Sequence, residues 1–201
     1  MNYIAVDISG KHLTLISEKN GKTYTFFDKD CGVDHSVKVM TELENLLIKA
    51  DMTVFDADFF ACATGAGSFT GIRIGVSTVK ALAFAARKPV LNITSFDTLA
   101  YNSDNGRVLA VIDAKHGGFY VCPYIDGAAG KPEYVLKDRL SEFEDFCFLS
   151  GEEIAGVKTE VVSAADGFVR AIEKKRGEIT DDINSLVPLY VRKSQAEEGR
   201  K

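Results

Sequence analysis

Apolar and polar positions alternate with a two-residue period near the start of the chain, which is the pattern of half-buried β-strands. Asn20-Gly21 separates two such runs and is a favoured two-residue hairpin turn. Further short apolar runs follow, each bounded by turn residues. The pattern predicts strands at residues 3–8, 12–17, 23–27, 59–63 and 89–93. The chain is therefore expected to open with an antiparallel meander and to continue with alternating helices and strands.

Two stretches, 35–50 and 72–87, repeat apolar residues with the period of a helix, and a shorter helix is expected through Tyr101. In the first stretch, apolar side chains cover an arc of roughly 200°, about twice what a helix on a sheet needs. Either both helices are buried between lobes, or they share an exposed apolar face that binds another protein. The second interpretation assigns this interface to Val37, Met40, Leu47, Ile74, Ala81, Leu82 and Ala85.

The opening pattern recurs in the second half of the chain. A β run at 108–112 ends at Asp113, just as the first run stops at Asp7. Aspartate is a common turn residue, so turn chemistry alone can explain the recurrence. The alternative is an internal duplication, which predicts an α/β protein with two lobes, residues 1–102 and 103–201. The remaining elements are predicted as strands at 119–124 and 133–136, and as helices at 140–146 and 164–175.

Composition and charge narrow the class of partner. The 201 residues carry 24 Lys and Arg against 29 Asp and Glu, a net charge of −5. A mildly acidic chain is poorly suited to hold a nucleic-acid backbone unaided. The four cysteines form no C-x-x-C pair, and no signal peptide or apolar run near the roughly 18 residues of a membrane span is evident. We therefore expect reduced thiols, a cytoplasmic location and no membrane contact.

The densest local pattern is a Gly-rich loop between a predicted strand and a predicted helix. It matches neither a P-loop nor a dinucleotide-binding fingerprint. Its glycines permit unusual backbone conformations, and N–H groups at a helix start attract a phosphate or carboxylate. The alternative is a tight turn that brings the helix close to the sheet. The loop residues are Gly65, Gly67, Ser68, Phe69, Thr70, Gly71 and Arg73, the last as an anion ligand or a solvated residue.

No catalytic set can be assembled from the sequence. The three histidines form no H-x-x-x-H pair, and no G-x-S-x-G nucleophile elbow occurs. Ser68 and Thr70 have hydroxyl groups, but no His or Lys is placed by sequence to activate them. We therefore expect neither catalytic residues nor a metal site.

A family resemblance rests on residues 67–76, Gly-Ser-Phe-Thr-Gly-Ile-Arg-Ile-Gly-Val, which closely resemble the characteristic segment of the bacterial TsaB (YeaZ) family. Ala66 departs from that family, which usually has proline there, and residues 126–187 show little that matches. Further family-like pieces are Lys80-Ala81-Leu82-Ala83, Ile4-Ala5-Val6-Asp7, His35-Ser36, Val111-Ile112-Asp113-Ala114 and Pro188-Leu189-Tyr190-Val191-Arg192.

The resemblance implies an actin/Hsp70-like (ASKHA) fold of two lobes, each a mixed sheet flanked by helices. It implies a degenerate nucleotide cleft, for which Asp7, Ser9 and Asp113 are the candidates, with weak or no ATP binding and no metal. The pairing surface of the family is built from the first two helices of the N-terminal lobe. Here these are the helices at 35–50 and 71–87, the same two that carry surplus apolar surface.

The function implied by the resemblance is a supporting one. Such a protein takes part in making threonylcarbamoyl-adenosine at position 37 of tRNA, as the non-catalytic partner of the catalytic paralogue TsaD. A TsaE-type ATPase joins the complex, tRNA is contacted only indirectly, and the chain alone is expected to be a homodimer. A second hypothesis is a nucleotide-dependent enzyme of the actin/sugar-kinase superfamily, with Asp7 and Asp113 placing magnesium and phosphate. A protease-like hydrolase is the least favoured, because metal ligands are absent from the sequence pattern.

Overall fold

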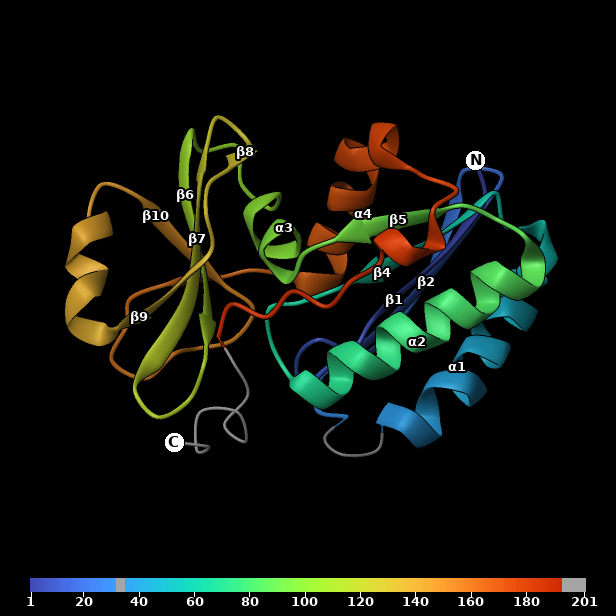
Figure 1. Ribbon diagram of the computed structural model, residues 1–201, viewed down its shortest axis with the longest axis horizontal. Coiled ribbons are helices and arrows are strands. Elements are labelled where there is room, and N and C mark those ends of the chain that lie inside the picture. Colours follow the sequence, from blue (N-terminus) through green and yellow to red (C-terminus); the bar gives the residue numbers. More distant parts are fainter. Residues whose placement is uncertain (32–34, 193–201) are drawn as a thin grey trace. The chain divides into compact units, whose positions relative to one another are not determined.

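The protein was analysed as a computed structural model, which describes residues 1–31 and 35–192, apart from the side chains of residues 35 and 36. The chain divides into two compact units. Unit 1 is Met1–Thr94 with Ile172–Pro188, and unit 2 is Ser95–Ala171 with the chain from Leu189 onward. Each unit has its own sheet (Figure 1).

Unit 1 contains a five-stranded mixed sheet in the order β3-β2-β1-β4-β5. Its first three strands form the predicted antiparallel meander, and β4 and β5 continue the sheet parallel to β1. The strands are β1 (Tyr3–Asp7), β2 (Leu13–Lys19), β3 (Lys22–Asp28), β4 (Phe59–Ala63) and β5 (Val90–Ile93). All five predicted strands of this half are therefore confirmed, with ends shifted by one or two residues.

Two helices, α1 (His35–Lys49) and α2 (Phe69–Ala86), lie next to each other on one face of this sheet (Figure 1). Alternate residues of β1 point toward them because strand side chains alternate between the two faces of a sheet. A short 3-10 helix, η1 (Val54–Asp56), follows α1. The core under the helices includes Ile4, Val6, Leu43, Leu46, Phe60, Val76 and Val79.

By length and composition, α2 could cross a membrane, which differs from the expectation that no such segment exists. Its buried residues, however, belong to the hydrophobic core of unit 1. In this stretch 39% of the residues are buried, among them Ile72, Val76 and Ala83, and a core helix of a globular protein meets the same criterion.

Unit 2 contains a second mixed sheet in the order β11-β10-β6-β7-β8, with β9 also paired to β7. Its strands are β6 (Arg107–Asp113), β7 (Gly118–Ile125), β8 (Ala128–Ala129), β9 (Glu133–Leu136), β10 (Cys147–Ser150) and β11 (Glu160–Val161). Its helical elements are α3 (Ser95–Ala100) and the 3-10 segment η2 (Lys137–Phe143). The last helix, α4 (Ala164–Lys175), begins in unit 2 and ends in unit 1, where η3 (Arg176–Glu178) and η4 (Ile183–Ser185) follow.

The two sheets share one topology, which confirms an α/β fold with an internal duplication. In each, the first strand pairs antiparallel with the second and parallel with a later one, so β1, β2, β4 and β5 correspond to β6, β7, β10 and β11. Asp7 and Asp113 each end the first strand of their sheet. Each also accepts a hydrogen bond from the backbone N–H two residues later, at 2.9 Å from Ser9 and 2.8 Å from Lys115.

Two predictions for the second half need correction. The helix predicted at 140–146 is instead η2, and its last residues lead into β10, which was not predicted. Phe146, Phe148 and Leu149 favour a strand because aromatic and large apolar side chains pack well on a pleated surface. The short strands β8 and β11 were also missed, since two residues carry no readable period.

The division into units also differs from the predicted boundary between 102 and 103. Residues 95–100 belong to unit 2, where α3 is buried and Asp97 accepts a hydrogen bond from the Tyr124 hydroxyl at 2.7 Å. The segment after α4 returns to unit 1, where Thr180 and Val90 exchange two backbone hydrogen bonds at 2.8 and 3.0 Å. Contacts between segments distant in sequence therefore define the units, and a single cut in the chain cannot describe them.

Candidate functional site

The Gly-rich loop joins β4 to α2 and is held by the turn after β1. Ser68 is the N-cap of α2, and its hydroxyl accepts a hydrogen bond from the Gly71 N–H at 3.2 Å. The Ser68 N–H donates to the Ser9 carbonyl oxygen at 2.7 Å. The helix therefore starts three residues earlier than predicted, because the Ser68 cap supplies a start that the apolar period does not reveal.

Close packing explains why two positions of the loop are glycine. A Cβ atom at Gly67 would lie 2.0 Å from the Ser9 carbonyl oxygen, and one at Gly71 would lie 2.0 Å from the Ile8 carbonyl oxygen. Gly67 also has φ +150°, which side chains of L residues rarely adopt. These distances favour the tight-turn interpretation, since the glycines let α2 approach the β1–β2 turn.

The other predicted loop residues lie close to this contact in sequence but differ in exposure. Gly65 is buried and Phe69 is half-buried. Ser68, Thr70 and Arg73 are exposed on the first turn of α2.

Asp7 is a buried titratable group of this region, with 1% of its surface exposed. One carboxylate oxygen accepts from the Ser9 N–H and from the Ser9 hydroxyl, the latter at 2.6 Å. The other oxygen lies 3.1 Å from His12 Nε2. Burial acts to raise the pKa of Asp7, but the charge and hydrogen bond of His12 and the bonds from Ser9 outweigh it, so the pKa lies below its usual range.

Asp113 has a different environment in unit 2. Its side chain is 29% exposed and forms an ion pair with Lys115 at 2.6 Å. The structure therefore brings Asp7, Ser9 and the loop glycines together in unit 1, while Asp113 pairs locally in its own turn. His12 and Lys115, which face these two carboxylates, were not predicted as site residues. Among the described residues, no group of three or more His, Cys, Asp and Glu side chains is arranged to hold a metal ion.

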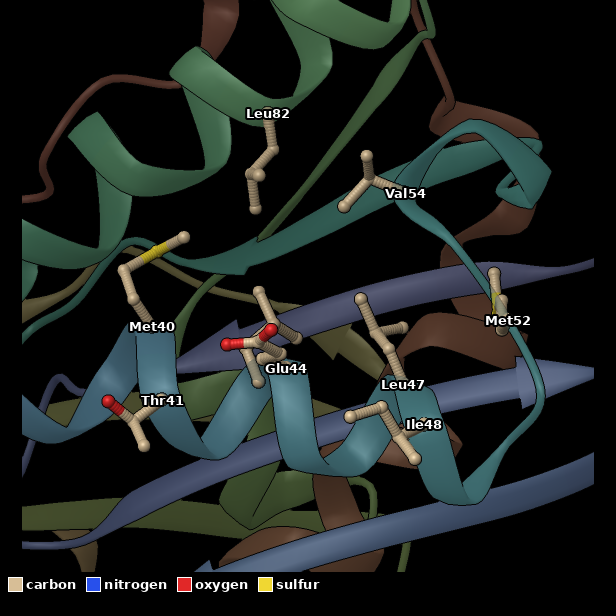
Figure 2. Close-up of a pocket in the computed structure, with 9 residues that line it drawn as sticks. Met40, Thr41, Glu44, Leu47, Ile48, Met52, Val54 and Leu82 are labelled. Atoms are coloured by element: carbon tan, nitrogen blue, oxygen red, sulfur yellow. The ribbon is translucent and has the colours of Figure 1, made fainter.

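The second candidate site is the outer surface of the two helices of unit 1. Figure 2 shows Met40, Leu47 and Ile48 of α1 on one side of a groove and Leu82 of α2 on the other. The groove has a volume of about 380 Å³ and is mostly apolar. Two of its lining side chains are largely exposed to water, Met40 by 52% and Ile48 by 71%. Val37 of α1 and Phe84 of α2 do not line the groove but are also exposed, by 74% and 78%.

The structure sorts the predicted interface residues by exposure. Val37, Met40, Ala81 and Ala85 are exposed. Ile74 and Leu82 are half-buried and pack against the core. Leu47 is only 8% exposed and belongs to the core of unit 1, but one side of it lines the groove, so its place in the interface stays a prediction.

Sequence reasoning missed Phe84 as an interface candidate. It lies three residues after Ala81, a spacing that puts both side chains on the same face of a helix, so the predicted position of Ala81 could have revealed it. Ile48 is likewise absent from the predicted interface, although it lies eight residues after Met40 and therefore on the same apolar stripe of α1.

The close approach at Gly71 gives a stability prediction. We expect Gly71→Ala to lower the free energy of unfolding by about 1–3 kcal/mol, because the added Cβ must push the Ile8 carbonyl away. Chemical denaturation monitored by circular dichroism measures this. Gly177→Ala is the matched control, since a Cβ there meets no atom within 4 Å. Equal stabilities of the two variants would contradict the packing explanation.

The Asp7 network gives a pH prediction. Because the pKa of Asp7 is lowered on folding, its stabilising contribution is present above the ordinary aspartate pKa of about 3.9 and is lost as pH falls further. At neutral pH, Asp7→Asn should lower the free energy of unfolding by about 1–3 kcal/mol. The difference from the unsubstituted protein should shrink below about pH 4. Denaturation at several pH values tests this, with Asp113→Asn as the control, for which about 0–1 kcal/mol is expected.

The chain is similar to proteins of known name and structure. The family model described as TsaD, tRNA N6-adenosine threonylcarbamoyltransferase, matches residues 29–147, more than half of the chain. The tRNA threonylcarbamoyladenosine biosynthesis protein TsaB of Bacillus subtilis is 27% identical, over 98% of this chain and 96% of that protein. TsaB of Escherichia coli is 29% identical, over 76% of this chain and 69% of that protein.

Among solved structures, YeaZ from Pseudomonas aeruginosa superposes with a TM-score of 0.78 at 21% identity, over 94% of this chain and 99% of that one. This likeness shows that the two-unit fold is the actin-like fold expected from the resemblance. The family match covers the Gly-rich loop, α1 and α2, and does not extend to the β1–β2 turn with Asp7 and Ser9. By the extent of that match and by its relatives, the chain belongs to the TsaD family and is of the TsaB (YeaZ) type.

Proposed function

We propose that this protein takes part in tRNA threonylcarbamoyladenosine biosynthesis as a non-catalytic subunit that binds and supports a catalytic TsaD-type protein. The observation that carries the proposal is the exposed apolar surface of α1 and α2. Met40 and Ile48 each expose more than half of their side chain at the groove, and Phe84 does so elsewhere on α2. Apolar patches of this kind are typical of protein–protein interfaces. The names of the TsaB relatives supply the biochemical process.

The surface has the features of a helix-packing interface. Ala81 and Ala85 are small and exposed on α2, so a partner helix can approach its backbone closely. The groove beside them accepts a larger side chain from the partner, with Leu82 and Met40 as its walls. Burying one such aliphatic or aromatic side chain contributes about 1.5–3 kcal/mol. A few of these contacts are enough for a specific complex.

In this proposal, the acidic chain contacts tRNA only through its partners, and a TsaE-type ATPase joins the complex. In the absence of TsaD, the same helical surface pairs two copies of this chain. The tRNA modification takes place in the cytoplasm. The net charge of −5 supports an indirect role, because direct binding to a phosphate backbone needs basic surface.

Charge on the α1–α2 surface should abolish partner binding. We expect Met40→Glu and Phe84→Glu each to weaken binding to a TsaD-type partner at least a hundredfold, because a buried unpaired carboxylate costs several kcal/mol. Both side chains are exposed in the isolated chain, so the stability of the monomer should change little. Isothermal titration calorimetry with purified TsaD from the same organism measures the affinity.

The matched control is Leu136→Glu, because Leu136 in unit 2 is 52% exposed, as Met40 is. It should bind the partner like the unsubstituted chain. If all three variants bind with one affinity, the α1–α2 surface is not the interface. If the unsubstituted chain itself does not bind TsaD, the scaffold role fails.

We further propose that the chain binds ATP weakly or not at all. Both carboxylate oxygens of Asp7 are already engaged by Ser9 and His12, and the Asp113 carboxylate is engaged by Lys115. Calorimetry with ATP and Mg²⁺ should give no measurable heat. Tight binding with turnover by the isolated chain would instead support the alternative of an enzyme of the actin/sugar-kinase superfamily.

A further inference from the structure

The two duplicated sheets differ most in the connection before their last strand. In unit 1, the 18-residue helix α2 connects β4 to β5. In unit 2, residues 151–159 connect β10 to β11 without any helix. Side chains at the start of β10 therefore have less cover, and Phe146 and Phe148 remain half-buried rather than buried.

A groove of about 600 Å³ lies where this helix is lacking. Phe146, Cys147 and Phe148 line one side, and residues 158–160 line the other. Its charged lining consists of Glu144, Glu160 and Lys158. Among the described residues, none of these three forms a salt bridge, although Glu160 accepts a hydrogen bond from the Cys147 thiol at 3.9 Å. The Arg107 guanidinium lies over the Phe146 ring at 4.3 Å, but its charge is paired with Asp145. The three lining charges that form no salt bridge therefore leave one negative charge in excess. The lining therefore favours an apolar side chain accompanied by a positive charge.

Beside the groove, β11 forms an edge of the sheet. The Val162 N–H donates to the Ser150 carbonyl oxygen at 2.8 Å. Inward and outward peptide groups alternate along a strand, so the N–H and C=O of Val161 point away from β10. Within the described part of the chain, β10 is the neighbour of β11 in the sheet. The Val161 side chain is 50% exposed.

The corresponding edge strand of unit 1, β5, is paired with another segment of the chain. There, Val90 at the start of β5 exchanges both backbone hydrogen bonds with Thr180, in antiparallel orientation. Thr180 lies in the segment that follows η3 and pairs with the edge at this one residue. The duplicated fold therefore contains, in one copy, the contact that the other copy leaves open to a second polypeptide.

We propose that β11 and its groove form a second docking site, which takes an extended segment of another protein as an added antiparallel strand. One residue of the segment exchanges two backbone hydrogen bonds with Val161, as Thr180 does with Val90. An apolar side chain of the segment enters the groove toward Phe146, and a basic side chain faces Glu144 and Glu160. Backbone pairing supplies the affinity, and the groove and its charges supply the selectivity.

The test uses the full chain and a library of random eight-residue peptides displayed on phage, followed by synthesis of the enriched sequences. Enriched peptides should carry a basic and an apolar residue within one strand length. In ¹⁵N-edited NMR spectra, they should shift the signals of residues 146–148 and 159–162. An empty selection, or shifts confined to α1 and α2, would overturn the proposal.

Val161→Pro is the decisive variant. Proline removes an N–H that points outward, so it leaves the pairing with β10 intact and blocks only the added strand. We expect the affinity of enriched peptides to fall about tenfold or more, from the loss of a hydrogen bond and the bulk of the ring. Val161→Thr keeps the N–H and should bind normally, and Phe84→Glu should also have no effect. Equal binding to Val161→Pro would refute the site.

A complementary measurement removes any dependence on how well Val161→Pro folds. The enriched peptide is methylated on the backbone nitrogen that faces Val161, and the unsubstituted protein is titrated with it. Strand pairing predicts a comparable loss of affinity, whereas methylation of the next nitrogen, which points to the opposite side, should be tolerated. If both methylated peptides bind equally, the segment does not pair with β11.

Discussion

Unit 1 depends on the contact between the start of α2 and the β1–β2 turn. Gly67 and Gly71 have no side chains, so the carbonyl groups of Ser9 and Ile8 lie where a Cβ would be. This approach fixes the distance of α2 from the sheet, and Val76 and Val79 then reach the core. It also fixes which side of α2 is left outside. Phe84 and the exposed alanines are available to a partner because the other face of α2 is already fully used.

The same turn stabilises the buried charge of Asp7. Asp7 ends the first strand inside the protein, where an unpaired carboxylate would be costly. Ser9 donates two hydrogen bonds to it and offers its own carbonyl oxygen to Ser68. His12 supplies a further partner at 3.1 Å. The turn is therefore shaped by Asp7 on one side and contacts the Gly-rich loop on the other, so the buried carboxylate serves as a structural support.

The sequence predicts the features whose cause is local. The Asn20-Gly21 turn and the alternation around Ile4 and Val6 predict the meander correctly, and the helical period predicts α1 and α2. Prediction from the sequence fails where contacts between residues distant in the chain determine the structure. Leu47 has the same local pattern as Met40, but only the tertiary packing shows that Leu47 is buried while Met40 is exposed. The return of the segment after α4 to unit 1 is likewise set by a pairing across 90 residues, between Val90 and Thr180.

The duplication shows how one topology produces two kinds of surface. In unit 1, the connection before the last strand is a long helix, which covers the sheet and carries an outward apolar face. In unit 2, the shorter connection covers less, so the start of β10 is only half-buried and β11 is exposed. A helix-packing interface selects a partner by side-chain shape over a broad area, whereas strand pairing selects an extended backbone along one edge. One topology therefore presents a broad helical surface in unit 1 and a strand edge in unit 2, because its halves differ in the length of a single connection.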